Sequence, residues 1–185
     1  MVEVGIYPMN QTEEENIMKI KTIPVDTTVA PYAEFYGALL DRGLKVPAPL
    51  QLVSASAPVF NVYRQLLTYF MTHDLMSPLL LGCIRYTVAY RSHFDACIHM
   101  NRDILALHGV TDLSSLKRDE PPVSLAKRDA LIYHFAVDAL FYPERITQTR
   151  IATLNDQNIS DALMFDAAFH GAMLLMMGPL VKSLG

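Results

Sequence analysis

The sequence predicts an all-α protein, a compact bundle of about seven to nine helices. Strand signals are missing, because no run of alternating β-branched residues and no Asn-Gly or Asp-Gly hairpin turn is found. Apolar residues instead recur at helical spacing along most of the chain. The 185 residues, 51% of them hydrophobic, suffice for one well-buried domain without a disulfide or metal.

The expected elements follow from capping residues and helix breakers, taken in chain order. Residues 1–28 form an extended lead-in, and residues 29–185 form the single domain. Four helices are expected in the first half, over about 31–40, 49–56, 58–70 and 78–91. The last of these begins at Ser77-Pro78, a capping residue followed by proline at the first helical position. It is apolar on most faces, so we expect it at the centre of the bundle.

The second half predicts four more helices, over about 94–108, 124–140, 143–155 and 161 onward. Gly109 follows the first of them, where a left-handed cap is expected. The charged segment at 117–122, with its two prolines, is the expected hinge between the two halves.

Composition excludes several classes of partner. A net charge of −4, with scattered lysines and arginines, argues against a nucleic-acid or anionic-membrane surface. The acidic start is unlike a signal peptide, and the apolar stretch at 167–181 is too short to span a bilayer. Two cysteines fourteen residues apart form neither a disulfide framework nor a zinc pattern. We therefore expect a cytoplasmic protein with no cofactor and no metal.

Residues 77–110 read SPLLLGCIRYTVAYRSHFDACIHMNRDILALHGV. This segment resembles the alkylhydroperoxidase D-like, or carboxymuconolactone decarboxylase, family. That family has a Ser-Pro helix carrying a glutamate, then Cys-x-x-Cys opening a second helix. A histidine or asparagine follows four residues later, before a Leu-x-x-x-Gly close. The resemblance covers roughly residues 50–180 as a pattern of helices. It implies a compact helical fold and a homo-oligomer, a trimer or a hexamer.

The family's functional positions are only partly kept. Gly82 stands where the family has its proton-relay glutamate, and Phe94 stands where it has the first cysteine. The second cysteine is Cys97, and the position four residues later is Asn101. Two parts of the classical two-cysteine peroxidase are therefore missing, and that activity is not expected.

The candidate catalytic residues are Cys97, His99, Asn101 and His93. Cys97 falls in the first turn of its helix, where free backbone N–H groups favour a thiolate, with His93 or His99 to assist. The alternatives are an inert buried cysteine and, for His99, a solvated face shared with two aspartates. These acids and histidines have no recognised zinc spacing. Cys83 could resolve Cys97 only if the Cα atoms came within roughly 7 Å.

Three functions fit these observations. The first is a one-cysteine thiol antioxidant or peroxidase-related protein that acts on a peroxide through Cys97 and needs an external thiol reductant. The second is a cofactor-free decarboxylase or lyase-like enzyme acting on a small molecule, for which Arg85, Arg91 and Arg102 are the candidate anion ligands. The third is a non-catalytic, ligand-binding oligomer.

Overall fold

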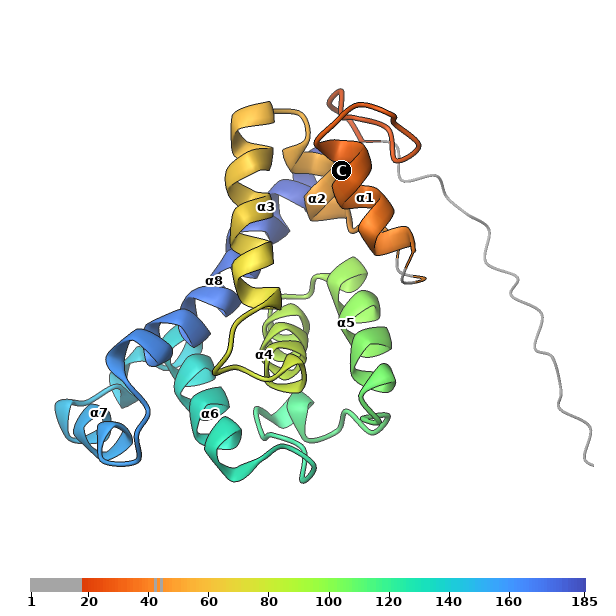
Figure 1. Cartoon of the computed structure of the whole chain (residues 1–185). Coiled ribbons are helices and arrows are strands. Elements are labelled where there is room, and N and C mark those ends of the chain that lie inside the picture. Colours follow the sequence, from red (N-terminus) through yellow and green to blue (C-terminus); the bar gives the residue numbers. More distant parts are fainter. Residues whose placement is uncertain (1–17, 42, 44) are drawn as a thin grey trace, which may run out of the picture.

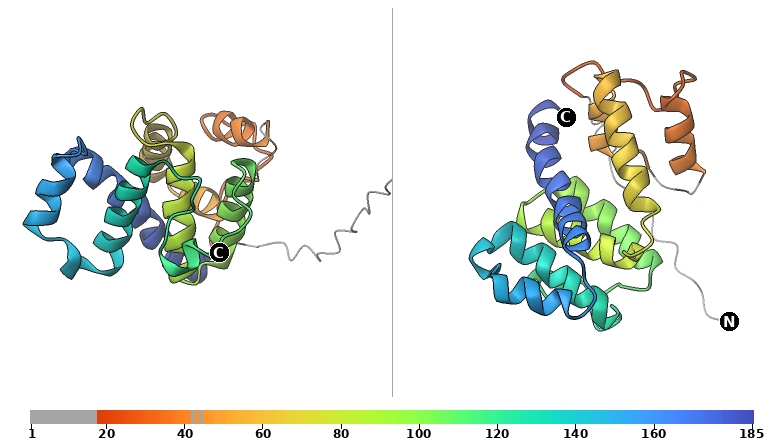
Figure 2. Two further views of the ribbon diagram at one scale, coloured as in Figure 1. Left: turned by 90° about the horizontal axis from the view of Figure 1, so that it is seen from below. Right: turned by 60° about the vertical axis from the view of Figure 1, so that its left-hand side comes forward.

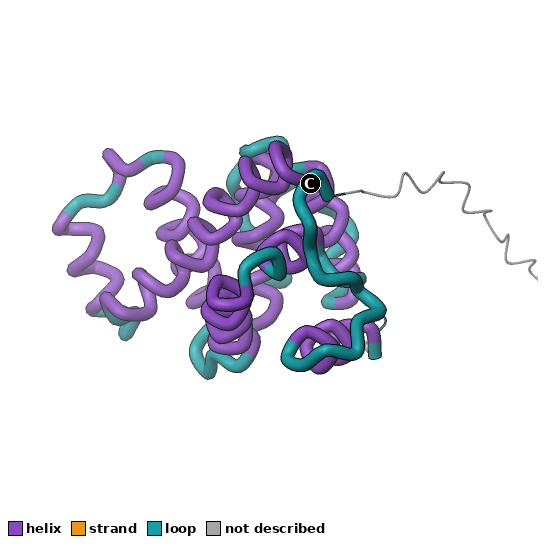
Figure 3. Tube along the Cα trace, turned by 90° about the horizontal axis from the view of Figure 1, so that it is seen from above, coloured by secondary structure: helices purple, strands orange, loops and turns teal. Residues whose placement is uncertain are grey.

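The structure, a computed structural model, describes residues 18–41, 43 and 45–185, and this part of the chain contains no strand (Figure 3). Its elements are α1 (Tyr32–Leu40), α2 (Ala48–Val53), α3 (Ala57–Met71), α4 (Pro78–Arg91), α5 (Asp95–Leu107), η1 (Leu116–Arg118), α6 (Lys127–Phe141), η2 (Pro143–Arg145), α7 (Gln148–Asn155) and α8 (Asp161–Leu184). The predicted all-α fold class is confirmed, with eight α-helices in the described residues.

Helix α4 lies at the centre of the bundle, as its apolar sequence predicts. It packs against α5, α6 and α8 (Figure 1). Its side chains Leu80, Ile84 and Val88 have no exposed surface. Helices α1 and α2 lie at one end of the molecule and α7 at the other (Figure 2). Helix α4, which carries the first part of the family-like segment, thus has neighbouring helices on three sides.

Local capping chemistry sets several helix ends. Ser77 Oγ accepts a hydrogen bond of 3.1 Å from the backbone N–H of Leu80, and Ser160 caps α8 in the same way. Gly109 follows α5 with φ +79°, the left-handed conformation expected there. The single helix expected over 143–155 is instead divided, because Thr147 caps a new helix by accepting from the N–H of Arg150.

Helix α8 is longer than the apolar stretch that the sequence singles out. Its 24 residues are long and apolar enough, by length and composition, to cross a membrane. In this fold Leu163, Ala167 and Leu174 are buried, and the helix packs against α4 and α6. A core helix of a bundle meets the same criteria of length and composition.

The predicted lead-in falls partly outside the described residues, which begin at residue 18. Residues 18–30 contain no helix. The N–H of Lys19 donates to the carbonyl of Leu184 at 2.8 Å, and that of Ile23 donates to Ser54 Oγ at 2.8 Å. In the predicted hinge segment, Asp119 pairs with Arg91 of α4 at 2.9 Å. The hinge itself stays a prediction.

Candidate functional site

Cys97 lies in the first turn of α5, on the side of the helix that faces the bundle. Its side chain is only 4% exposed, and Asn101 and Leu105 on the same face are fully buried. Asp95, His99 and Asp103 are exposed on the opposite side. The division into two faces is therefore as the helical spacing predicts.

Burial dominates the ionisation of the Cys97 thiol. Removal from water raises the pKa of Cys97 above its ordinary value, and the positive charge of Arg85 on α4 partly opposes this. The sequence predicts a thiolate favoured by the helix start, but in the structure the cost of desolvation is larger. Arg85 is the nearby charge that favours the reactive form.

The two candidate histidines do not join Cys97 on its buried face. His99 is two residues along α5, about 200° around the helix at 3.6 residues per turn, and it is exposed. His93 is also exposed, in the turn between α4 and α5, with φ +55°. Both histidines are thus exposed, whereas the Cys97 thiol is buried.

Asn101 is buried directly below Cys97. Its Nδ2 donates to the backbone carbonyl of Cys97 at 2.7 Å, one helical turn back, while its Oδ1 has no hydrogen-bond partner. This side chain ties the first turn of α5 together, and it leaves a free acceptor inside the bundle.

Packing surrounds the two positions at which the sequence departs from the family pattern. A Cβ on Gly82 would lie 3.1 Å from Cδ2 of Leu105, a tight contact that the Leu105 side chain would have to relieve by shifting. The ring of Phe94 lies against α8, where a Cβ on Gly178 would come within 1.9 Å of it. Gly82 and Phe94 thus serve the packing of helices and supply no catalytic group.

Cys83 belongs to another part of the interior. It is fully buried, and burial together with the carboxylate of Asp129 on α6 raises its pKa to about 12. Arg85, two residues along α4, points to the opposite side of that helix. Both cysteines are free thiols. Cys83 lacks the acidity of a resolving thiol.

Three further polar residues come together from three different helices. Tyr63 of α3, Arg85 of α4 and His170 of α8 line one small cavity. Burial raises the pKa of Tyr63, the charge of Arg85 lowers it by less, and Cys97 raises it by the smallest amount. The sequence analysis singles out only Arg85 among these three residues, as a candidate anion ligand. The available signals for the site were Arg85 in the apolar helix α4 and His170 in the apolar helix α8.

His170 is the most unusual of these residues. It is buried beside Phe70, with ring centroids 4.6 Å apart, and neither ring nitrogen has a hydrogen-bond partner. Burial lowers its pKa to about 3, with smaller contributions from Arg85 and His73, while a backbone contact with Leu81 that falls short of a well-formed hydrogen bond opposes the shift. His170 is therefore neutral at physiological pH.

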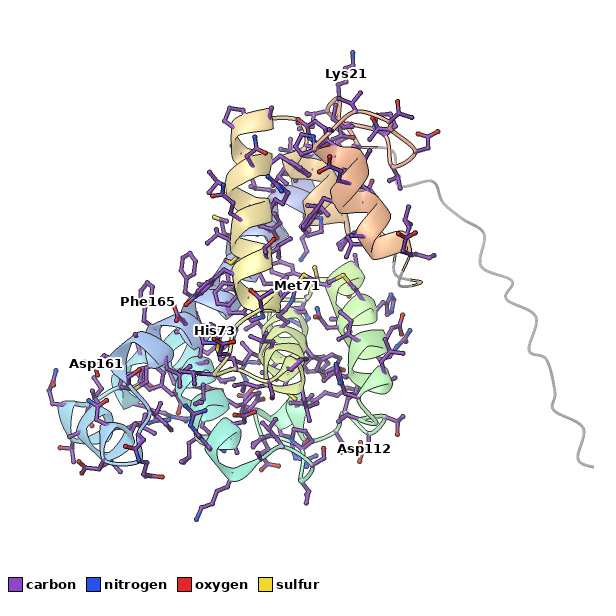
Figure 4. The ribbon with its side chains drawn as sticks, in the orientation of Figure 1. Lys21, Met71, His73, Asp112, Asp161 and Phe165 are labelled. Atoms are coloured by element: carbon purple, nitrogen blue, oxygen red, sulfur yellow. The ribbon has the colours of Figure 1, made fainter. Side chains whose placement is uncertain are left out.

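Polar contacts between α3 and α8 lead from the surroundings of His170 to the surface of the molecule. His73, at the end of α3, lies beside α8 (Figure 4), and its Nε2 is 3.3 Å from Asp166 Oδ2. Tyr69 donates to the same oxygen at 2.7 Å. These contacts fasten α3 to α8 above the cavity. Among the described residues, no group of three or more His, Cys, Asp or Glu side chains gathers to hold a metal ion.

Comparison with solved structures gives a clear likeness of fold. The chain is similar to an uncharacterized peroxidase-related protein from Silicibacter sp. TM1040. The likeness covers 95% of this chain and 93% of that chain, with a TM-score of 0.71 and 16% sequence identity. No protein-family model and no curated protein matches the sequence. At this identity the likeness shows a shared fold.

Proposed function

We propose that this protein is a thiol-dependent, peroxide-reducing protein of the alkylhydroperoxidase-like kind that acts through Cys97 alone. The observation that carries the proposal is the place of Cys97 in the first turn of α5, where free backbone N–H groups favour a thiolate. The charge of Arg85 acts in the same direction, although burial raises the pKa of Cys97 by more. The shared fold with a peroxidase-related protein supports the same class. His93, His99 and Asn101 are given no direct chemical step.

The proposed reaction has two stages. The Cys97 thiolate attacks one peroxide oxygen, the O–O bond breaks, and the sulfur is oxidised to a sulfenic acid. The leaving alkoxide or hydroxide takes the proton that the thiol has lost, and so becomes an alcohol or water. One external thiol then condenses with the sulfenic acid and releases water, and a second displaces Cys97 from the mixed disulfide.

The need for an external reductant follows from the packing. Phe94 fills the position of the partner cysteine, and the thiol of Cys83 faces α6. We place the reaction in the cytoplasm, where small thiols and thioredoxins are kept reduced. Because burial raises the Cys97 pKa, turnover should increase with pH through the neutral and alkaline range.

Peroxide consumption in excess dithiothreitol tests the proposal. Cys97→Ser should reduce consumption to the rate of the reductant alone, and Cys83→Ser should retain wild-type turnover as the matched control. Undiminished turnover in Cys97→Ser would overturn the proposal.

We further propose that the protein assembles as a homo-oligomer, a trimer or a hexamer. Large apolar side chains are exposed along α3 and α8, including Val62 at 58% and Phe165 at 66%. Figure 4 shows Phe165 on α8 and Met71 at the end of α3. Such a surface is typical of a contact between subunits. Light scattering after gel filtration should give a multiple of 20.7 kDa for the wild type and a smaller mass for Val62→Glu. A wild-type monomer would contradict this assembly.

A further inference from the structure

One large side chain, Phe94, lies at the start of the helix that carries Cys97. Phe94 immediately precedes α5, and Cys97 follows three residues later, so both lie on nearly the same side of the first helical turn. Side chains on a helix lean toward its N-terminus, and the Cys97 thiol therefore points toward the turn that Phe94 begins. Cys97 is only 4% exposed, whereas Phe94 is half-buried. This places Phe94 on the path from solvent to the thiol at this end of α5.

The Phe94 ring is held by two successive turns of α8. Gly178 leaves room for the tip of the ring, because a Cβ at this position would overlap the ring atoms Cζ, Cε1 and Cε2. One helical turn later, Nζ of Lys182 lies 5.0 Å from the centre of the same ring. A cation over an aromatic face is a favourable contact. The closed position of Phe94 is thus fixed by contacts with the C-terminal part of α8.

This part of α8 is less firmly held than the core of the bundle. Pro179 lies inside the helix and has no N–H, so one helical hydrogen bond is missing directly beside the Phe94 contact. The last turn is bound by exposed contacts from the start of the described chain. The backbone N–H of Lys19 donates to the carbonyl of Leu184 at 2.8 Å, and Lys19 Nζ donates to that of Ser183 at 3.1 Å. Segments with such contacts open locally at a lower free energy than buried core helices.

We propose that Phe94, held by Gly178 and Lys182, is a gate that sets the size of the reagents that reach Cys97. In the closed position the ring covers the thiol, and small local openings admit small molecules only. For peroxide reduction, this inference rests on the proposed function and names its substrate class as hydrogen peroxide and short alkyl hydroperoxides. Bulky aromatic hydroperoxides are excluded by the ring. Phe94 is therefore a specificity-determining residue that takes no part in the chemical step.

Labelling of the native protein with two maleimides of different size tests the gate without any peroxide. N-ethylmaleimide and the much larger N-(1-pyrenyl)maleimide form the same thioether, and peptide mass spectrometry gives the rate at each cysteine. Each rate at Cys97 is divided by the rate for the urea-unfolded protein, which removes the intrinsic difference between the reagents. In the wild type, the relative rate of the pyrenyl reagent should be roughly tenfold or more below that of the ethyl reagent. The fully buried Cys83 should stay unlabelled, which reports an intact fold.

Three variants test whether the gate is Phe94. Phe94→Ala should raise the relative rate of the pyrenyl reagent roughly tenfold or more, and that of the ethyl reagent by less. Lys182→Gln changes an exposed side chain and should raise the pyrenyl rate about two- to fivefold, since it removes the cation over the ring. Phe165→Ala is the matched control, because this exposed ring lies on the same helix, about 20 Å along α8 from Gly178 (Figure 4). It should leave both rates unchanged.

Two outcomes of the labelling would overturn the gate. One is equal relative rates of the two maleimides at wild-type Cys97, and the other is equal effects of Phe94→Ala and Phe165→Ala. The first of these needs no variant to fold.

Peroxide consumption in dithiothreitol separates the gate from the proposed function. The wild type should consume hydrogen peroxide but not cumene hydroperoxide, and Phe94→Ala should consume both. If the wild type consumes no peroxide, the proposed function fails, and the maleimide rates still decide the gate. If wild-type Cys97 reduces cumene hydroperoxide as fast as hydrogen peroxide, the proposed function stands and the gate is overturned.

Discussion

His170 should make the stability of the protein sensitive to acid, and replacing it should remove that sensitivity. The folded protein keeps this imidazole neutral because burial lowers its pKa to about 3, whereas the unfolded chain protonates it near 6.5. Above pH 6.5 both states are neutral and the residue adds no pH dependence. Between pH 6.5 and pH 3 the unfolded state binds the additional proton, so stability falls as the pH falls.

The size of the effect follows from these two pKa values. One proton taken up only by the unfolded chain changes the free energy of unfolding by about 1.4 kcal/mol per pH unit. From pH 7 to pH 5, with the start of titration included, the loss attributable to His170 is about 2 kcal/mol. This loss of unfolding free energy depends little on the pKa of His170 in the folded protein, provided that this pKa stays well below 5.

Urea unfolding followed by helical circular dichroism at pH 7, 6 and 5, at one protein concentration, measures this difference. His170→Phe and His170→Gln should each lose about 2 kcal/mol less than the wild type over this range. His99→Gln, a change at an exposed histidine, should follow the wild type. Parallel stability curves for the wild type and both His170 variants would refute a buried neutral imidazole.

Three further predictions follow from the packing and the thiol environments. Alkylation of native Cys97 by iodoacetamide, followed by mass spectrometry, should become faster as the pH rises into the alkaline range, and it should be slower in Arg85→Gln. Cys83 should stay unlabelled until the protein unfolds. Equal labelling of both thiols would contradict this expectation. In urea unfolding, Gly178→Ala should lower the free energy of unfolding by about 1–3 kcal/mol, because the added methyl group meets the Phe94 ring. Gly37→Ala should raise it by about 0.5–1 kcal/mol, because the space around Gly37 is open. Ser77→Ala should cost about 1–2 kcal/mol in the same assay, since Ser77 caps α4 and donates to Asp129; an unchanged midpoint would remove its capping role.

The helices could be predicted because their signals are local. Ser77-Pro78 begins α4, Gly109 follows α5, and Ser160 begins α8, each at the position expected from capping chemistry. The helix expected over 143–155 was less well predicted, because the Thr147 cap competes with continuation of the helix after Pro143. Here two local signals conflict, and the sequence does not show which one is stronger.

The site depends on contacts that no local pattern contains. The helical spacing places Cys97 on the buried face of α5, but the balance between its helix start and its burial depends on the packing of α5 against the bundle. Arg85 and His170 lie 85 residues apart in the chain and meet only in the folded bundle. The two exposed histidines near Cys97 in sequence were the more visible candidates. Folding instead brings Tyr63, Arg85 and His170 together from three helices at one cavity.

The most direct test of the central claim is to trap the oxidised form of Cys97. The reduced protein would receive one equivalent of hydrogen peroxide with dimedone present, and peptide mass spectrometry would locate the adduct. We expect a dimedone adduct of the sulfenic acid on Cys97 and none on Cys83. The amount of adduct should be smaller in Arg85→Gln than in Arg102→Gln. An unmodified Cys97 after complete consumption of the peroxide, or an adduct on Cys83 instead, would contradict it.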